Sequence, residues 1–203
     1  FRSREFEQME IEYFVDPKDW EKYFEKFQKK VWDFISTVGI DTTKVSELEV
    51  ADEDRAFYSK RTIDFEFEYP FGKKELYGLA YRTDYDLKGH GEVSKVDLSY
   101  FDEETRERFI PHVIEPSFGL ERTLLAILTS AYSEDEVNGE TRVFLRLNKE
   151  IAPYQCAVFP LLKNKPDLVA KAKEVYDLLK KKGIRVMFDD NGNIGKRYRR
   201  QDE

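Results

Sequence analysis

An alternating run of apolar and acidic residues in the first half of the chain sets the strongest limit on the fold. Residues 63–71 carry a large apolar side chain at every odd position and an acid at the first three even positions. This alternation predicts a β-strand with one buried face and one face in water. Pro70 and Gly72 end the run, and residues 75–80 have the pattern of a returning strand. A hairpin of this kind predicts an antiparallel sheet.

A long helix with an aromatic stripe is expected before that hairpin. Asp16 followed by Pro17 is typical of an N-cap and a first helical position, and Gly39 is a typical C-cap. Large apolar side chains recur between them at helical spacing, so we assign this stripe to the core and give it no chemical role. They are Trp20, Tyr23, Phe24, Phe27, Val31, Phe34, Ile35 and Val38.

A different pattern begins after residues 148–153. Residues 156–159 predict an apolar strand, residues 166–182 a helix closed by glycine, and residues 184–188 a second strand. A strand–helix–strand unit of this kind pairs its strands in parallel. The predicted fold class is therefore α+β. An antiparallel sheet with helices forms a first domain over residues 1–150, and an α/β domain follows over residues 151–203.

Other segments carry weaker signals. The alternation of residues 4–14 predicts a strand, and short helices are expected at residues 52–59 and near residues 102–109. A short buried strand at residues 112–115 is expected to lead through a glycine turn into a helix, and residues 143–147 predict a further strand. The inner face of that helix is expected to carry Leu120, Leu124, Ile127, Leu128 and Ala131.

Composition excludes several classes of protein. The chain of 203 residues is 40% hydrophobic, enough to form real cores. One cysteine and two histidines exclude an internal disulfide and a Cys/His zinc site. The longest apolar run, residues 124–128, is too short to cross a bilayer. Because no secretory leader is visible and Cys156 fits a reducing compartment, a cytoplasmic protein is expected. The net charge of -7 argues mildly against a general nucleic-acid binder.

Three stretches place acids and arginines among apolar residues: residues 4–10, 75–86 and 115–122. A buried charge without a partner is very costly, so these groups should pair with one another or with a ligand. Arginine suits phosphate, and carboxylates suit an ammonium group or Mg²⁺. The three stretches therefore predict a site for a polyanion, a metal and a small zwitterion.

Taken together, these stretches resemble glycyl-tRNA synthetases of the dimeric class II type over nearly the whole chain. Residues 2–14 resemble the second half of motif 2, and residues 115–122 resemble motif 3. Residues 74–87 resemble the intervening segment, and residues 193–203 resemble part of the anticodon-binding domain. The runs Phe-Glu-Gln-Met-Glu and Glu-Pro-Ser-Phe-Gly favour glycine over the histidyl, threonyl and prolyl relatives. No motif 1 and no first strand of motif 2 are recognised, and the chain starts at Phe1, so we expect a piece of a longer protein.

The resemblance implies an ATP site with Mg²⁺. Arg4 and Arg122 are the implied catalytic residues, with Arg122 reaching the γ-phosphate, and Glu75 is the implied Mg²⁺ ligand. The residues implied to bind ATP are Phe1, Arg2, Ser3, Arg4, Glu5, Phe6, Glu75, Leu76, Gly119, Leu120, Glu121 and Arg122.

The resemblance also implies a glycine pocket. Glycine has no side chain to grip, so selectivity must come from charge on its ammonium and carboxylate groups and from excluding a Cβ atom. Arg82 is implied to clamp the carboxylate, and Glu115 and Ser117 to hold and confine glycine. The residues implied to border glycine are Phe6, Glu7, Gln8, Met9, Glu10, Arg82, Glu115, Pro116, Ser117, Phe118 and Gly119.

A basic cluster near the end of the chain has two interpretations. It is either a contact for the tRNA backbone or an ordinary solvated face. Its members are Lys196, Arg197, Arg199 and Arg200. The acids Asp84 and Asp86 are expected to make only local hydrogen bonds in a loop, and we assign them no role.

The expected function is that of a glycine–tRNA ligase. Such an enzyme uses ATP to convert glycine to glycyl-adenylate and transfers it to the 3′ end of tRNA(Gly). The implied cofactors are ATP and Mg²⁺, and the implied partners are glycine, tRNA(Gly) and a second copy in a homodimer. The alternative is a non-catalytic nucleic-acid-binding paralogue or accessory subunit of the class II synthetase fold.

Overall fold

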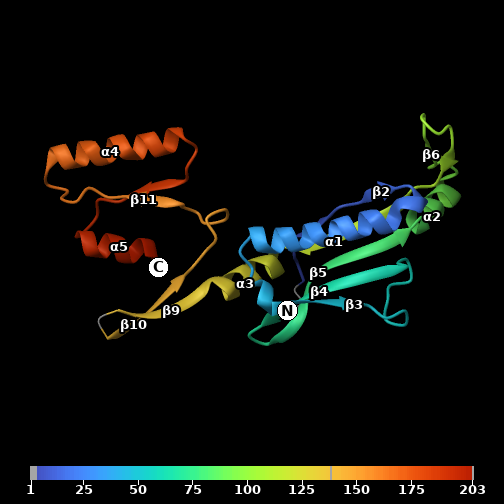
Figure 1. Ribbon diagram of the computed structural model, residues 1–203, viewed down its shortest axis with the longest axis horizontal. Helices are drawn as coiled ribbons and strands as arrows, with labels where there is room; N and C mark the ends of the chain where they lie inside the picture. Colours follow the sequence, from blue (N-terminus) through green and yellow to red (C-terminus); the bar gives the residue numbers. More distant parts are fainter. Residues whose placement is uncertain (1–3, 138, 203) are drawn as a thin grey trace. The chain divides into compact units, whose positions relative to one another are not determined.

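A computed structural model describes residues 4–137 and 139–202 (Figure 1). The chain divides into two compact units. Residues up to 36 together with 40–129 form the first unit, and residues 37–39 together with those from 130 onward form the second. The domain boundary expected after residue 150 stays a prediction. Within the described residues, no helix is both long and apolar enough to cross a membrane.

The first unit is built on the predicted antiparallel sheet, whose strand order is β1-β8-β5-β4-β3, with β2 also paired to β8. The predicted hairpin is confirmed, and Gly72 at its turn has φ 108°. The strands are β1 (Gln8–Glu10), β2 (Tyr13–Val15), β3 (Val45–Glu49), β4 (Arg61–Tyr69), β5 (Gly72–Thr83) and β8 (His112–Gly119).

Helix α1 (Trp20–Thr37) runs along one face of this sheet in Figure 1. Asp16 accepts a hydrogen bond from the amide of Lys18 and so caps the preceding 3₁₀ turn η1 (Pro17–Asp19) as the sequence predicts. Phe24 and Ile35 are completely buried. Each such side chain contributes about 2 kcal/mol through burial, so the helix holds one face of the sheet in the core.

Several local predictions for the first unit are wrong. The strand expected at residues 4–14 is divided into β1 and β2, which pair with β8 in one register. The amide of Ile11 bonds to the carbonyl of Pro116 between them, but Pro116 has no N–H with which to complete the pair. Residues 52–59 form turns rather than a helix. The helix expected near residues 102–109 is replaced by a small hairpin of β6 (Tyr100–Phe101) and β7 (Arg108–Phe109).

Three further elements of the first unit differ from expectation or were not expected. A 3₁₀ turn η2 (Thr42–Lys44) leads into β3, and helix α2 (Tyr85–Ser94) follows β5 where Asp84 and Asp86 were expected to lie in a loop. The short strand expected at residues 112–115 extends as β8 through Gly119 to the start of helix α3 (Leu120–Ala131).

The expected inner face of α3 is wrong at its three leucines. Leu120, Leu124 and Leu128 are exposed, whereas Thr123 and Ala126 are buried. Ala131 is buried as expected, and Ile127 is half-buried. The hydroxyl of Thr123 contacts the hydroxyl of Tyr77 at 3.0 Å, which satisfies both polar groups in the core. The small residues Thr123 and Ala126 therefore pack against the sheet, although the apolar periodicity indicated the leucines.

The second unit contains the predicted parallel pair. Strands β11 (Cys156–Val158) and β12 (Val186–Phe188) pair in parallel and are joined through helix α4 (Pro166–Lys181). Gly183 has φ 77°, as its predicted position after the helix requires. The unit also contains the antiparallel hairpin of β9 (Tyr132–Val137) and β10 (Glu140–Leu145), and helix α5 (Ile194–Asp202).

Candidate active site

The strand registers divide the side chains of the central sheet into two faces. Phe65, Tyr77 and Phe118 lie opposite one another across β4, β5 and β8, on the face toward α1. The ring of Phe118 packs 5.4 Å from that of Phe34 of α1. Because side chains alternate along a strand, the neighbouring positions in each strand face the other way. This second face is free of α1 and can hold a ligand.

Short and polar side chains line the second face in register. Asp64 pairs with Gly78, Gly78 with Ser117, and Ser117 with Glu10, so one row crosses four strands. A cavity of about 330 Å³ lies over this row. A Cβ atom added at Gly78 would meet no heavy atom within 4 Å, so the centre of the row is open to a ligand.

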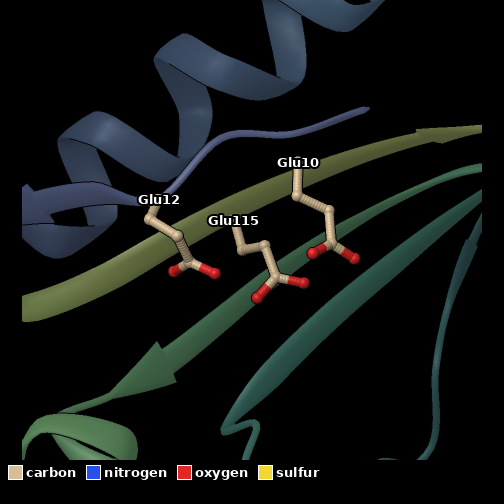
Figure 2. A group of neighbouring side chains, drawn as sticks. All are labelled: Glu10, Glu12 and Glu115. Atoms are coloured by element: carbon tan, nitrogen blue, oxygen red, sulfur yellow. The ribbon is translucent and has the colours of Figure 1, made fainter. Parts of the chain in front are cut away.

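Three carboxylates meet at one end of this face. Figure 2 shows the side chains of Glu10, Glu12 and Glu115 pointing to the same side. One oxygen of each lies within 4.8 Å of the others, and Glu115 is only 7% exposed. Burial raises the pKa of Glu12, the charge of Glu115 raises it further, and the nearby Arg82 opposes this shift. Three like charges at this spacing favour a bound cation.

Arg82, at the end of β5, supplies positive charge beside these acids. Its Nε donates to Oδ2 of Asp86 at 2.8 Å, and its Nη1 donates to Glu115. Burial by itself lowers the pKa of Arg82, but the hydrogen bonds to Asp86 and Glu115 outweigh it and raise the pKa. The guanidinium therefore stays charged and contributes to balancing the acids.

A polar side chain joins β1 to β8 beside the acids. Nε2 of Gln8 donates to Oε1 of Glu10 at 2.7 Å and to Oγ of Ser117 at 2.7 Å. The glutamine amide thus fixes the orientation of one carboxylate and one hydroxyl at the cavity wall. Gln8, Glu10, Ser117 and Glu115 all lie on the predicted glycine-binding stretches, and the structure brings them together.

The other end of the face holds the predicted ATP residues Glu75 and Arg122. Nη1 of Arg122 lies 3.1 Å from Oε2 of Glu75. Burial, followed by the charges of Glu75 and Glu66, raises the pKa of Asp64 to about 6, against the opposing effect of Arg122. Glu75 and Asp64 line the same cavity and offer carboxylate oxygens. This donor chemistry fits Mg²⁺, which prefers hard oxygen ligands.

The segment before β1 is joined to the start of α3. The amide of Glu7 donates to Oε1 of Glu121 at 3.0 Å, and the amide of Leu120 donates to the carbonyl of Glu7 at 2.9 Å. Arg4, Glu5 and Phe6 precede this junction and are exposed. The predicted ATP residues Phe1, Arg2 and Ser3 lie outside the described residues.

Strand alternation corrects part of the predicted site. Leu76 has no exposed surface and Pro116 is fully buried, so both belong to the core. Phe118 packs on the α1 face, and Met9 pairs with Phe118 in the register. Contiguous stretches were expected to line the site, whereas successive residues of a strand point to opposite faces.

Sequence reasoning missed several residues of this face. Glu12, Thr62, Asp64 and Gly78 were given no role, and Asp86 was left as a loop acid. The alternation of acids with phenylalanines in residues 63–69 was the available signal for Asp64, since it places the acids on the face away from the core. Glu12 and Asp86 had no comparable signal, because their proximity to Glu115 and Arg82 depends on tertiary structure.

The structure separates the members of the basic cluster on α5. Arg197 is only 1% exposed, and its guanidinium donates to the carbonyls of Asp190 and Gly192 at 3.1 and 2.8 Å. Arg197 therefore holds the turn before α5 and is not placed to meet a tRNA phosphate, which corrects the expectation from the sequence. Lys196, Arg199 and Arg200 are exposed, and Arg200 also pairs with Asp189 at 2.7 Å.

Comparison with protein families gives two matches. Residues 1–131 match the tRNA synthetase class II core domain (G, H, P, S and T). Residues 155–203 match the anticodon-binding domain. The two matched segments cover the sheet with its α3 helix and the parallel β11–β12 unit.

Individual relatives agree with this assignment. The glycine–tRNA ligases of Ureaplasma parvum serovar 3 and Clostridium tetani are 49% and 47% identical over the whole of this chain. The chain spans 42% and 43% of their lengths. A structure of Giardia lamblia prolyl-tRNA synthetase in complex with prolyl-adenylate has a TM-score of 0.65 and 16% identity. It covers 95% of this chain, while the match spans 37% of that protein, and it supports the fold.

Proposed function

Because this chain belongs to the class II tRNA synthetase core family, we propose that it carries the glycine-activating site of a glycine–tRNA ligase. The observation that carries the proposal is the group of three carboxylates at Glu10, Glu12 and Glu115 beside the charged Arg82, on an open sheet face. The identity of nearly half to curated glycine–tRNA ligases supports glycine as the substrate. This identity also favours the enzyme over a non-catalytic paralogue.

Both ends of glycine have a partner at this site. We assign the ammonium group to the carboxylates of Glu10 and Glu115, and the carboxylate to Arg82. Gln8 orients Glu10 and Ser117 through its amide, so these groups are held before glycine arrives. Every amino acid carries the ammonium and carboxylate groups that such a site binds. Selection against larger amino acids must therefore come from the space around Cα, where they carry a Cβ atom.

Activation requires alignment more than a protein nucleophile. A carboxylate oxygen of glycine attacks the α-phosphorus of ATP, the bond to the bridging oxygen breaks, and pyrophosphate leaves with its electron pair. Arg122 is suited to neutralise charge on the phosphates, and Arg4 is assigned to the same task. Mg²⁺ held by Glu75 and Asp64 would supply further charge neutralisation for the phosphates.

The second unit supports recognition of the RNA substrate. We assign the exposed Lys196, Arg199 and Arg200 of α5 to contacts with tRNA(Gly), because cations on one helix suit a phosphate backbone. The match of residues 155–203 to the anticodon-binding domain supports this assignment. The family resemblance further supports a homodimer that works in the cytoplasm and a division of roles near residue 150.

The test is glycine-dependent exchange of pyrophosphate into ATP by the protein that carries this chain. Exchange is expected with glycine and not with alanine or serine at the same concentration. Glu10→Gln is the variant most directly tied to the site, and it should raise the KM for glycine while the KM for ATP changes little. Exchange that proceeds equally with any small amino acid would overturn the proposed substrate.

A further inference from the structure

The guanidinium of Arg82 is held by Glu115 of the proposed glycine pocket and by two residues, Tyr58 and Asp86, to which no contact with glycine is assigned. Its Cζ atom lies 4.1 Å from the centroid of the Tyr58 ring. Its Nε atom donates to Asp86, and its Nη1 atom donates to Glu115. The Arg82 side chain is only 18% exposed. Three neighbours from three different elements therefore restrain one flexible side chain.

These contacts leave one edge of the guanidinium for a ligand. Arginine carries five N–H donors in a rigid planar fork. Among residues 4–137 and 139–202, no hydrogen-bond partner contacts Nη2 of Arg82. A carboxylate binds such an edge in the plane of the fork. The restraint on the other atoms thus fixes where that edge points.

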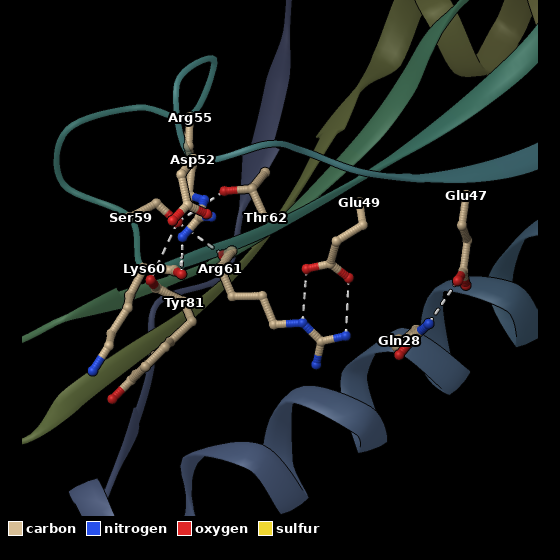
Figure 3. A network of polar contacts seen from close by, with 10 residues as sticks. All are labelled: Gln28, Glu47, Glu49, Asp52, Arg55, Ser59, Lys60, Arg61, Thr62 and Tyr81. Carbon is tan, nitrogen blue, oxygen red and sulfur yellow. Dashed lines mark hydrogen bonds and ion pairs between the residues drawn. The ribbon is translucent and has the colours of Figure 1, made fainter.

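Tyr58 is itself anchored by the loop that carries it. Figure 3 shows the bonds that tie this loop to β4 and β5. The amide of Lys60 donates to the carbonyl of Tyr81 at 2.8 Å, and Oγ of Ser59 donates to the carbonyl of Arg61 at 2.8 Å. Arg55 also bonds to the carbonyl of Lys60 and to Asp52. These bonds anchor the loop next to Tyr58, and this loop presents the Tyr58 ring to the Arg82 cation.

Asp86 reaches Arg82 because the chain reverses after β5. Thr83 has φ 59°, a left-handed conformation that ends the strand, and α2 begins two residues later. Asp86 then lies in the first turn of α2 and accepts from Nε of Arg82. The residue that looked like a loop acid in the sequence is thus a partner of the guanidinium.

We propose that Tyr58 and Asp86 are positioning residues for the glycine carboxylate, which act by holding Arg82 with its Nη2 edge free. This inference rests on the proposed function. Neither residue is assigned a contact with glycine or ATP. Holding a long side chain before the ligand arrives lowers the entropy lost on binding, so the effect belongs to the affinity for glycine.

The test compares variants of the protein that carries this chain in glycine-dependent pyrophosphate exchange. Tyr58→Ala is expected to raise the KM for glycine about tenfold, because it removes one cation–π interaction, with the KM for ATP unchanged. Tyr58→Phe keeps the ring and should behave as the parent protein. Asp86→Asn should raise the KM for glycine by a similar factor, because it weakens a charge-assisted hydrogen bond.

Tyr85→Ala is the matched control. It removes an exposed aromatic ring next to Asp86 that contacts Phe57 and not Arg82. It should leave both KM values unchanged. The inference is overturned if Tyr58→Ala and Asp86→Asn leave the KM for glycine unchanged, or if they raise the KM for glycine and for ATP equally.

A second measurement separates positioning of Arg82 from general damage. Methylamine carries an ammonium group but no carboxylate, so it probes the acids without probing Arg82. Its inhibition constant should be the same in the parent protein and in Tyr58→Ala, and a rise parallel to the KM for glycine would overturn the inference. A parent protein without glycine-dependent exchange would instead refute the proposed function.

Discussion

Arg122 of α3 reaches both the side chain and the backbone of Glu75 of β5. Nη1 of Arg122 lies 3.1 Å from Oε2 of Glu75 and 3.2 Å from the carbonyl oxygen of the same residue. The Arg122 side chain is 30% exposed and that of Glu75 is 49% exposed, so solvent screens the pair. An ion pair screened by solvent contributes little to stability. Because the pair lies on the proposed ATP site, we assign Arg122 to the phosphates of ATP instead.

Replacing Arg122 with Ala should abolish activity without unfolding the protein. We expect glycine-dependent exchange to fall at least about 100-fold, because the protein no longer has a positioned cation for the phosphates. The melting temperature should change little, since the ion pair is half-exposed. Arg61→Ala removes the ion pair of Arg61 with Glu49 on the same sheet and should leave exchange unaffected. Exchange that survives in Arg122→Ala within a few-fold would contradict the assignment.

Replacing Glu115 with Gln should weaken glycine binding and lower the pKa of Glu12. The charge of Glu115 is one cause of the raised pKa of Glu12, so its removal moves that pKa toward the ordinary value. The KM for glycine should rise by on the order of tenfold or more, because a buried carboxylate no longer faces the ammonium group. The measurement is the pH dependence of the KM for glycine, whose acidic limb should move to lower pH. An unmoved limb would show that Glu12 is not coupled to Glu115.

Replacing Asp64 with Asn should stabilise the first unit at neutral pH. The pKa of this carboxyl is raised from 3.8 to about 6, so between these values the folded state holds a proton that the unfolded chain has released. The free energy of unfolding therefore falls as the pH rises through that window. Above it, the ionised carboxylate of Asp64 continues to destabilise the folded state. Thermal unfolding of Asp64→Asn at pH 7 should show a higher midpoint and a flatter dependence on pH across that window. A lower midpoint at pH 7 would contradict this account.

Replacing Arg197 with Ala should destabilise the second unit by about 3 kcal/mol, because its removal leaves the buried carbonyl of Pro160 and the part-buried carbonyls of Asp190 and Gly192 without this donor. The measurement is urea or thermal unfolding followed by a probe in that unit. Lys196→Ala is the matched control, since its exposed side chain belongs to the same helix and should cost little. Equal stability of the two variants would refute the structural role of Arg197.

Replacing Arg199 and Arg200 with Ala should weaken tRNA binding in a salt-dependent manner. The slope of log K against log salt should become shallower by about one unit for each phosphate that these side chains neutralise. The measurement is tRNA affinity at several salt concentrations. Glycine-dependent exchange without tRNA serves as the control and should not change. An unchanged slope would favour the interpretation of these residues as a solvated face.

Elements with strong local patterns could be predicted from the sequence. The alternation of residues 63–71, the capping by Asp16 and Pro17, and the strand–helix–strand pattern from residue 156 each depend on neighbours in the chain. The same reasoning failed for residues 52–59 and 102–109. There, other local contacts replaced the expected helices, namely the bonds of Arg55 to Asp52 and Lys60 and the short β6–β7 hairpin.

The sequence could predict which segments form the candidate site, but not which side chains of those segments face the cavity. Glu10, Glu115, Ser117 and Arg82 stand on the stretches expected from the sequence, and the structure brings them together. Leu76 and Pro116 were included only because they adjoin such residues, and both are in the core. The direction of a strand residue depends on register and on which face the neighbouring helix covers, which no single stretch reveals.

The sequence by itself determined the chemistry available to this protein, namely carboxylates and arginines set among apolar strands, with no disulfide. Only the tertiary structure decided which of these charges meet. Glu12 and Glu115 are about a hundred positions apart in the chain, and Tyr58 and Asp86 approach Arg82 from a loop and a helix. The reason is physical. Side-chain type is a local property, whereas the pairing of β8 with β1, β2 and β5 brings distant segments side by side.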